Sequence, residues 1–519
     1  MISILRGSGH DVSTVFDPKG FKAWESSTPT SELDDNIVDT IIKTGCQALF
    51  AYTTTVHFQR LVNIFDLVKE RAPNITIAVG GPHATYAHEH TIRKKSIDYL
   101  CRGEGEIAIL QILELIDRTR TELPVGVYRM NRDLIEGKGF GSLVNDLDDL
   151  PYPDKSDFYE NVPNVRDVYT TATGRGCYNS CTFCNSPTMR THYRDEGYQF
   201  LRRRSVDDVV SELALAKKIY NPRLIFFVDD TFIYNKRYMS EFAKQYKDKV
   251  GIPFRCSTIP NFFHEEVIDD LVDAGLFAVD VGVQSLNPDT RLAIFGRKES
   301  NDQYTAFISM LKRRGVYTVT DHIINPWDTR ENLKQQLLQY SVTRPSWINV
   351  FHLQYFPDTK VIEEAIRDGH LDPEAVEGIG EGNINSYFRG GDIQDIMESL
   401  HDLIVLLPFV PILPAWLTKL IVNTRLLVLF KIMPSQLVLV LRAINAMIRG
   451  GDEPGRLYLK ILFQSIFKIQ VRAAKHQLKT IKEMAKSKPV RLLSPQVALR
   501  QVNTNNMPIN SSGTRSASI

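Results

Sequence analysis

The chain has 519 residues, 43% of them hydrophobic and 24% charged, which is the composition of a globular protein of about three domains of ~150 residues each. Six cysteines, three of them close together and three far apart (Cys46, Cys101, Cys256), do not form a disulfide framework. The composition therefore excludes a disulfide-stabilised secreted scaffold and favours a reducing, cytoplasmic compartment. No long apolar run opens the chain, so no secretory signal is expected.

The net charge of +1 hides an uneven distribution. Residues 451–519 contain 12 Lys and Arg against 3 Asp and Glu, whereas residues 1–450 contain 50 against 58. A basic tail therefore follows an acidic body, and the tail is where an anionic surface is expected to bind. Nucleic acid is not an expected partner.

The first domain, expected over residues 1–125, alternates short apolar runs with helical patterns, as parallel α/β sheets do. The predicted strands are 11–16, 48–54, 76–81 and 98–102, and the predicted helices are 33–44 and 58–71. Strand ends carry residues that suit a sharp turn or close approach to a ligand: Gly80, Gly81, Gly103 and Glu104. Turn formation alone would also account for them.

A connector with a β-hairpin is expected over residues 126–165, because apolar periodicity is poor there and turn residues are frequent. Alternation of strands and helices resumes over 166–370. The predicted strands are 168–171, 224–228, 254–257, 278–283, 317–324 and 348–351. The predicted helices are 206–219, 264–274, 302–313 and 331–342. These segments predict a second α/β domain.

Three cysteines stand in a Cys-x3-Cys-x2-Cys spacing at Cys177, Cys181 and Cys184, with Phe183 just before the last. A closed zinc site or a fully protein-ligated cubane cluster needs four ligands, so three thiolates leave one iron open for a ligand. Two alternatives remain, namely a zinc site with a fourth ligand such as His192, and three unrelated buried thiols.

The cysteine motif resembles the radical S-adenosylmethionine (radical SAM) superfamily, and segments of residues 1–125 resemble the cobalamin-binding domain that precedes many radical SAM domains. The second resemblance rests on Gly-His-Asp-Val at 9–12, Ala-Val-Gly-Gly-Pro-His-Ala-Thr at 78–85 and Arg-Gly-Glu-Gly-Glu at 102–106. It implies a flavodoxin-like or Rossmann-like domain, followed by a partial (β/α)6 barrel with its chemistry at the C-terminal strand ends.

Two features depart from the cobalamin-binding pattern. The Asp-x-His-x-x-Gly signature is absent, so His10, His57 and His83 are not expected to bind cobalt. Only eight residues precede Gly9, which is too few for the strand and helix that the family places there. We therefore expect either a truncated chain or an incomplete domain whose sheet lacks its first strand, with weak cobalamin binding.

The resemblance also assigns residues to the SAM site. Asp229 and Asp230, after a strand, resemble the acidic loop near the methionine part of SAM, although this sequence would also cap a helix. Gln284 and Ser285 resemble the strand end close to the SAM ribose. Arg175, which precedes the cysteines, either tunes the potential of the cluster through its charge or is an ordinary structural arginine.

The chemistry implied by the resemblance begins with a one-electron donor, such as flavodoxin or ferredoxin, that reduces a [4Fe-4S] cluster. The cluster then cleaves SAM to methionine and a 5′-deoxyadenosyl radical, which takes a hydrogen atom from carbon. With cobalamin, the expected outcome is C-methylation of a small or lipid-like substrate. The alternatives are a non-methylating cyclisation or rearrangement, tRNA methylthio transfer, and a non-catalytic binding module. Methylthio transfer would need the cysteines of a second cluster near the N-terminus, and Cys46 and Cys101 are too few for one.

The C-terminal part is expected to be helical over 371–490 and disordered over 491–519. Residues 403–418 contain no charge and three prolines, which is too short and broken for a spanning helix of ~20 residues. They predict either a helical cap on the barrel or an in-plane membrane segment. A basic amphipathic helix predicted at 456–479 favours peripheral contact with the inner face of the membrane.

Overall fold

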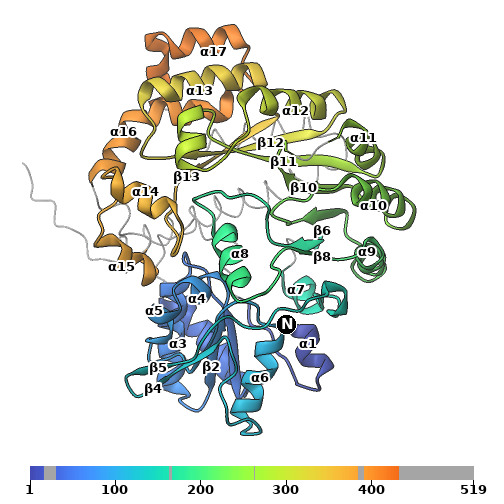
Figure 1. Cartoon of the computed structure of the whole chain (residues 1–519), viewed down its shortest axis with the longest axis vertical. Coiled ribbons are helices and arrows are strands. Elements are labelled where there is room, and N and C mark those ends of the chain that lie inside the picture. The colour runs from blue at the N-terminus through green and yellow to red at the C-terminus, as the bar shows by residue number, and fades with distance from the viewer. Residues whose placement is uncertain (17–30, 163–165, 262–263, 384–390, 432–519) are drawn as a thin grey trace, which may run out of the picture. The chain divides into compact units, whose positions relative to one another are not determined.

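Two β-sheets organise the computed structural model, which describes residues 1–16, 31–162, 166–261, 264–383 and 391–431 (Figure 1). All of these residues belong to one compact unit, Met1–Gln464. The first sheet is formed by the N-terminal part of the chain and the second by its central part, and helices follow from residue 361 onward.

The N-terminal sheet has five strands in the order β1-β2-β3-β4-β5. The first three are parallel, and the last two form an antiparallel hairpin that extends the sheet beside β3. The strands are β1 (Ala48–Tyr52), β2 (Thr76–Gly80), β3 (Tyr99–Cys101), β4 (Val127–Asn131) and β5 (Leu134–Glu136). The helices are α1 (Ile2–Gly7), α2 (Ser31–Lys43), α3 (Phe58–Arg71), α4 (Pro82–Tyr86), α5 (His88–Ile92) and α6 (Glu106–Ile116).

Helix α3 shows why these segments fold as predicted. Phe58, Val62, Phe65 and Val68 recur at helical spacing and are all buried, so one face of the helix packs into the core beside the strands. The predicted helices 33–44 and 58–71 and the predicted strands 48–54, 76–81 and 98–102 are confirmed to within a few residues.

The strand predicted at 11–16 is wrong, because residues 11–16 are described and form neither a strand nor a helix. Their polar groups are bound elsewhere: the Arg6 guanidinium donates to the carbonyl of Val12, and the Thr14 hydroxyl bonds to Asp157. Alternation of apolar and polar residues favours an extended backbone, but an extended segment becomes part of a sheet only when it pairs with a neighbouring strand. Among the described residues, no strand precedes β1, and residues 2–7 form α1.

The second sheet has six parallel strands in the order β13-β12-β11-β10-β9-β6, with helices along its outside (Figure 1). Its strands are β6 (Val168–Thr171), β9 (Leu224–Phe227), β10 (Phe254–Thr258), β11 (Leu276–Gln284), β12 (Tyr317–Ile324) and β13 (Trp347–His352). Its helices are α9 (Val206–Tyr220), α10 (Lys236–Lys249), α11 (Glu265–Asp273), α12 (Asn301–Arg313) and α13 (Arg330–Thr343). All six predicted strands and all four predicted helices are confirmed.

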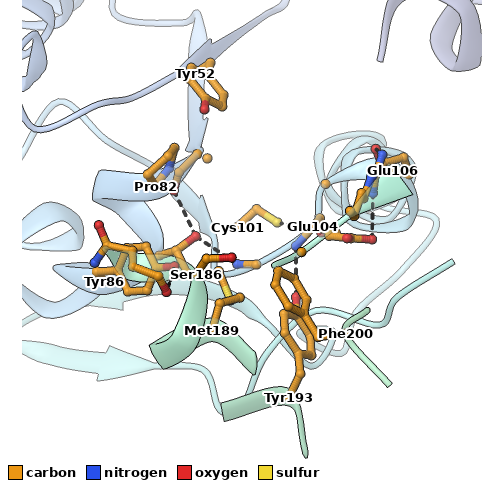
Figure 2. A pocket seen from close by; sticks show the side chains of 18 of the residues that line it. Tyr52, Pro82, Tyr86, Cys101, Glu104, Glu106, Ser186, Met189, Tyr193 and Phe200 are labelled. Atoms are coloured by element: carbon orange, nitrogen blue, oxygen red, sulfur yellow. Dashed lines mark hydrogen bonds and ion pairs between the residues drawn. The ribbon is translucent and has the colours of Figure 1, made fainter. Parts of the chain in front are cut away.

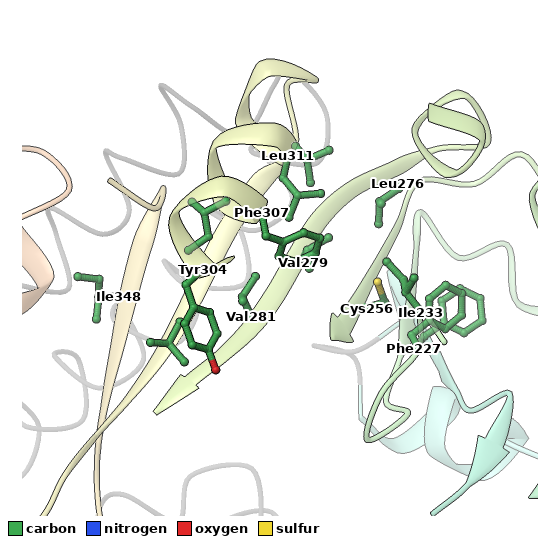
Figure 3. Packing of buried hydrophobic residues seen from close by; sticks show 14 of the residues in the cluster. Phe227, Ile233, Cys256, Leu276, Val279, Val281, Tyr304, Phe307, Leu311 and Ile348 are labelled. Atoms are coloured by element: carbon green, nitrogen blue, oxygen red, sulfur yellow. The ribbon is translucent and has the colours of Figure 1, made fainter. Parts of the chain in front are cut away.

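The core of this domain lies between the sheet and its helices (Figure 3). Val279 and Val281 of β11 face Tyr304, Phe307 and neighbouring side chains of α12, and all four are fully buried. Capping residues delimit the helices. Ser300 forms a capping box with Gln303 at the start of α12.

Helices α6 and α10 were not predicted, and neither were α1, α4 and α5. Several further elements were also not predicted. They are α7 (Ser156–Asn161), β7 (Gly174–Arg175), α8 (Asn185–Asp195), β8 (Arg202–Arg203), a one-turn π-helix (Thr290–Ile294), α14 (Val361–Arg367) and α15 (Ala375–Gly380). The two strands β7 and β8 pair with each other and flank the cysteines. Helix α8 begins directly after Cys184.

The C-terminal helices that the structure describes are α16 (Gly391–Leu406), η6 (Leu407–Phe409), α17 (Ala415–Val422) and η7 (Arg425–Lys431). They pack against α13 and the edge strand β13, and Leu403, Leu407 and Phe409 are buried. Within the described ranges, the helices are too short or too polar to cross a bilayer. The predicted basic helix at 456–479 and the tail at 491–519 lie outside the described residues.

Candidate functional site

The cysteine loop (Cys177–Cys184) carries three thiols whose sulfurs accept hydrogen bonds. The backbone N–H of Asn179 donates to Sγ of Cys177 at 3.4 Å, and the Asn179 side-chain amide donates to the same sulfur at 3.3 Å. The backbone N–H of Ser186 donates to Sγ of Cys184 at 3.5 Å. Hydrogen bonds to sulfur are among the features that set the potential of iron-sulfur clusters, so the loop suits such a group.

A buried arginine approaches the third thiol. Arg297 Nη1 lies 3.6 Å from Sγ of Cys181, and Nη2 donates to the carbonyl of Gly282 at 2.5 Å and to the Tyr304 hydroxyl at 3.1 Å. A Cβ added at Gly282 would lie 3.2 Å from Nε2 of Gln284 and 3.6 Å from Arg297. Arg297 thus connects the cysteine loop to the end of β11.

Burial raises the pKa of two thiols of the loop, those of Cys181 and Cys184. Arg297 opposes the rise at Cys181, whereas the pKa of Cys184 is raised to about 12. Such thiols bind a metal by releasing their protons. Three soft sulfur donors on one loop, with hydrogen-bond donors around them, are a chemically reasonable set for an iron-sulfur cluster.

The two predicted aspartates differ in their surroundings. Asp229 is buried and accepts hydrogen bonds from the backbone N–H and the hydroxyl of Thr173 at 3.0 and 2.7 Å, and it pairs with Arg203 at 2.6 Å. Burial raises its pKa, while Arg203 and Thr173 oppose that rise. Asp230 is exposed, and its carboxylate accepts from the Ser186 hydroxyl at 3.0 Å. Asp230 is therefore the carboxylate with room for a ligand.

A cavity of about 930 Å³ lies between the C-terminal ends of the N-terminal strands and the cysteine loop (Figure 2). Its volume is near the upper end of the ~300–1,000 Å³ usual for ligand sites. Eight of the twelve predicted site residues line it: Gly80, Gly81, Gly103, Glu104, Phe183, Cys184, Asp229 and Asp230. The structure thus brings together residues that are separated by up to 150 positions.

The other four predicted site residues do not line the cavity. Cys177 and Cys181 lie on the same loop as Cys184. Gln284 ends β11 with a left-handed φ of +66°, and the Ser285 hydroxyl is fully buried and donates to Oε1 of Gln336 at 3.0 Å. Hydrogen bonding inside the protein therefore occupies Ser285.

Two glycines bring the backbone close to neighbouring groups at the cavity wall. Gly81 has φ of +98°, and a Cβ there would lie 2.8 Å from the carbonyl oxygen of Thr53. Gly103 has φ of +102°, and a Cβ there would collide with the Tyr193 hydroxyl. Only glycine fits both the conformation and the space.

An ion-pair cluster joins the turn after β3 to the strands beside the cysteine loop. Arg175 pairs with Glu104 at 2.7 Å and with Glu106 at 2.6 Å, and Arg202 also pairs with Glu104. Burial acts to raise the pKa of Glu106, but the hydrogen bond and charge of Arg175 leave it below its ordinary value. Arg175 therefore holds the two segments together.

The histidines that the sequence analysis considered as metal ligands have other surroundings. His10, His57 and His83, which were not expected to bind cobalt, are absent from the cavity wall. His192 Nε2 pairs with Asp358 at 2.7 Å, so this ring nitrogen already has a partner. The alternative of a zinc site completed by His192 is correspondingly disfavoured.

Comparison with known proteins identifies both domains. Residues 171–335 match the radical SAM superfamily and residues 2–113 match the B12-binding domain. The chain is 25% identical to an uncharacterised methyltransferase of Pyrococcus horikoshii, covering 61% of this chain and 69% of the relative. It is 26% identical to cytidylyl-2-hydroxyethylphosphonate methyltransferase of Streptomyces wedmorensis, covering 66% and 70%.

A solved structure shares the fold. The cobalamin-dependent S-adenosylmethionine radical enzyme OxsB, with aqua-cobalamin and S-adenosylmethionine bound, superposes with a TM-score of 0.57 at 14% identity. The match covers 86% of this chain and 74% of that one. The protein is thus a radical SAM enzyme with an N-terminal B12-binding domain. It belongs to the cobalamin-dependent radical SAM family, whose cofactors are a [4Fe-4S] cluster, SAM and cobalamin.

Proposed function

We propose that this enzyme transfers a methyl group to a carbon atom of a small or lipid-like substrate. The observation that carries the proposal is the single cavity of about 930 Å³ shared by the glycine-bearing edge of the B12-binding domain and the cysteine loop. Methyl transfer requires the two cofactors to face one substrate. The named relatives from Pyrococcus horikoshii and Streptomyces wedmorensis, both methyltransferases, support the same reaction type.

Each group of residues has a proposed task. Cys177, Cys181 and Cys184 hold the cluster, and Gly81 and Gly103 allow the tight packing of the two turns that would border cobalamin. When bound, these cofactors supply the radical and methyl-transfer chemistry, whereas the protein binds and orients the reactants. A flavodoxin or ferredoxin is the proposed electron donor.

The remaining predicted residues are assigned to SAM and its surroundings. We propose that Asp230, with the neighbouring Ser186, binds the SAM ammonium, because an exposed carboxylate forms charge-assisted hydrogen bonds. Phe183 lies beside Phe295 at 5.0 Å between ring centres and closes the cavity wall next to Cys184. Gln284 is proposed to face the SAM ribose, and Ser285 acts only by holding the strand end.

The test is anaerobic reconstitution of the full chain with iron, sulfide and hydroxocobalamin, followed by incubation with SAM and a reductant. We expect 5′-deoxyadenosine from SAM cleavage and S-adenosylhomocysteine from methylation of cobalamin. Formation of 5′-deoxyadenosine without S-adenosylhomocysteine would favour a non-methylating rearrangement. Titration of the apoprotein with hydroxocobalamin tests the expectation of weak binding.

Changing Asp230 to Asn is expected to weaken SAM binding about tenfold, since hydrogen bonds to charged groups are worth about 1.5–3 kcal/mol. Because Asp230 is exposed, thermal stability should stay unchanged. Changing Asp229 to Asn should instead lower the free energy of unfolding by about 3 kcal/mol, because the partly buried Arg203 loses its counter-charge. Equilibrium dialysis with SAM and thermal unfolding separate the two effects, and equal SAM affinity in wild type and Asp230→Asn would contradict the assignment.

A further inference from the structure

Large apolar side chains are exposed on α17 and in the turn that precedes it. Trp416 and Leu420 stand four residues apart on α17, so they share one face of that helix, and Ile412 stands four residues before Trp416. Their exposed fractions are 37% for Ile412, 68% for Trp416 and 43% for Leu420. Exposed apolar residues are common singly, but a contiguous group marks an interaction surface.

The neighbouring helix η7 extends this surface. It packs against α17 and exposes Leu426, Val428 and Leu429 with fractions of 42%, 56% and 56%. We call the six residues together the apolar strip: Ile412, Trp416, Leu420, Leu426, Val428 and Leu429.

The fold does not need the apolar strip to form its core. The opposite sides of α17 and η7 already bury Ile421, Val422, Leu427 and Phe430 in the main core of the radical SAM domain. Segments that are apolar on both sides, with one side in the core, present their second side to an apolar partner.

The charges around the apolar strip indicate the kind of partner. Lys419 and Arg425 are exposed beside it, and residues 403–431 contain no Asp or Glu. The preceding acid, Asp402, is buried and pairs with Arg330 at 2.6 Å. A second copy of the chain is a poor partner, because a two-fold contact would bring the same positive charges together.

We propose that the apolar strip is a membrane-contact surface for an anionic lipid bilayer. Trp416 and its apolar neighbours enter the headgroup region, where tryptophan is favoured, while Lys419 and Arg425 bind lipid phosphates. Helix α17 has eight residues, about 12 Å in length, which suits a helix lying in the plane of the interface. This inference does not depend on the reaction assigned above.

The test compares full-length variants in sedimentation with sucrose-loaded vesicles of phosphatidylcholine, with and without phosphatidylglycerol. The double change Trp416→Ser and Leu420→Ser should weaken binding to anionic vesicles about tenfold or more. The matched control is Leu134→Ser, because Leu134 on β5 is 75% exposed and lies outside the strip. Since residues 451–519 are basic, all variants keep them and are compared at the same salt concentration.

Fluorescence gives a second readout. The difference spectrum between wild type and Trp416→Phe should shift to shorter wavelength when anionic vesicles are added. Equal sedimentation of wild type and the double variant would overturn the proposal. So would a wild-type dimer, seen by light scattering, that the double variant abolishes, because the strip would then be a protein interface. Trp416 emission that is already blue-shifted and protected from iodide without vesicles would also overturn it.

Discussion

Replacing Cys181 with alanine is expected to abolish both the iron-dependent visible absorbance of the reconstituted enzyme and its reductive cleavage of SAM. Cys181 is one of three thiols on the cysteine loop and lies buried, 3.6 Å from Arg297. Its loss leaves only two protein anchors for a cluster that is proposed to need three. Iron content, the visible spectrum and 5′-deoxyadenosine formation measure the result.

The control is Cys256→Ala. Cys256 lies fully buried among apolar side chains in the core of the second sheet (Figure 3), so its replacement should cost only the roughly 0.5–3 kcal/mol usual for single substitutions. Its iron content should match wild type. Retention of absorbance and SAM cleavage in Cys181→Ala would remove the cysteine loop as the cluster site.

The regular elements could be predicted because their signals are local. The six parallel strands of the second sheet are short apolar runs between helical patterns, and periodicity alone locates them. The same signal failed at residues 11–16, where alternation suggested a strand. Pairing with a neighbour is a long-range property that a short window of sequence does not contain.

The same distinction between local and long-range signals applies to the residues of the candidate site. Three cysteines within eight positions are visible in the sequence, whereas Arg297 follows Cys181 by 116 positions and carries no local signal. Asp229 and Asp230 are adjacent and chemically identical. Both line the cavity, and only burial separates Asp229, which Thr173 and Arg203 hold, from the exposed Asp230.

Replacing Gly103 with alanine is expected to remove most cobalamin binding and to lower the free energy of unfolding by about 2–6 kcal/mol. Two costs add up: a left-handed backbone at φ of +102° and a collision of Cβ with the Tyr193 hydroxyl, each worth about 1–3 kcal/mol. The same hydroxyl accepts a hydrogen bond from the backbone N–H of Glu104 at 3.1 Å, so the collision also displaces the turn that lines the cavity (Figure 2).

A matched glycine and a rescue variant separate these two costs. Gly197 has φ of +84° with nothing within 4 Å of an added Cβ, so Gly197→Ala should show the backbone cost alone and keep cobalamin binding. In Gly103→Ala, a second change of Tyr193→Phe removes the colliding oxygen and leaves the ring carbon Cζ at 3.2 Å. The double variant should therefore be more stable than the sum of the single effects predicts. Thermal unfolding and titration with hydroxocobalamin measure both quantities. If Gly103→Ala behaved like Gly197→Ala in both, the close approach at this turn would have no part in binding the cofactor.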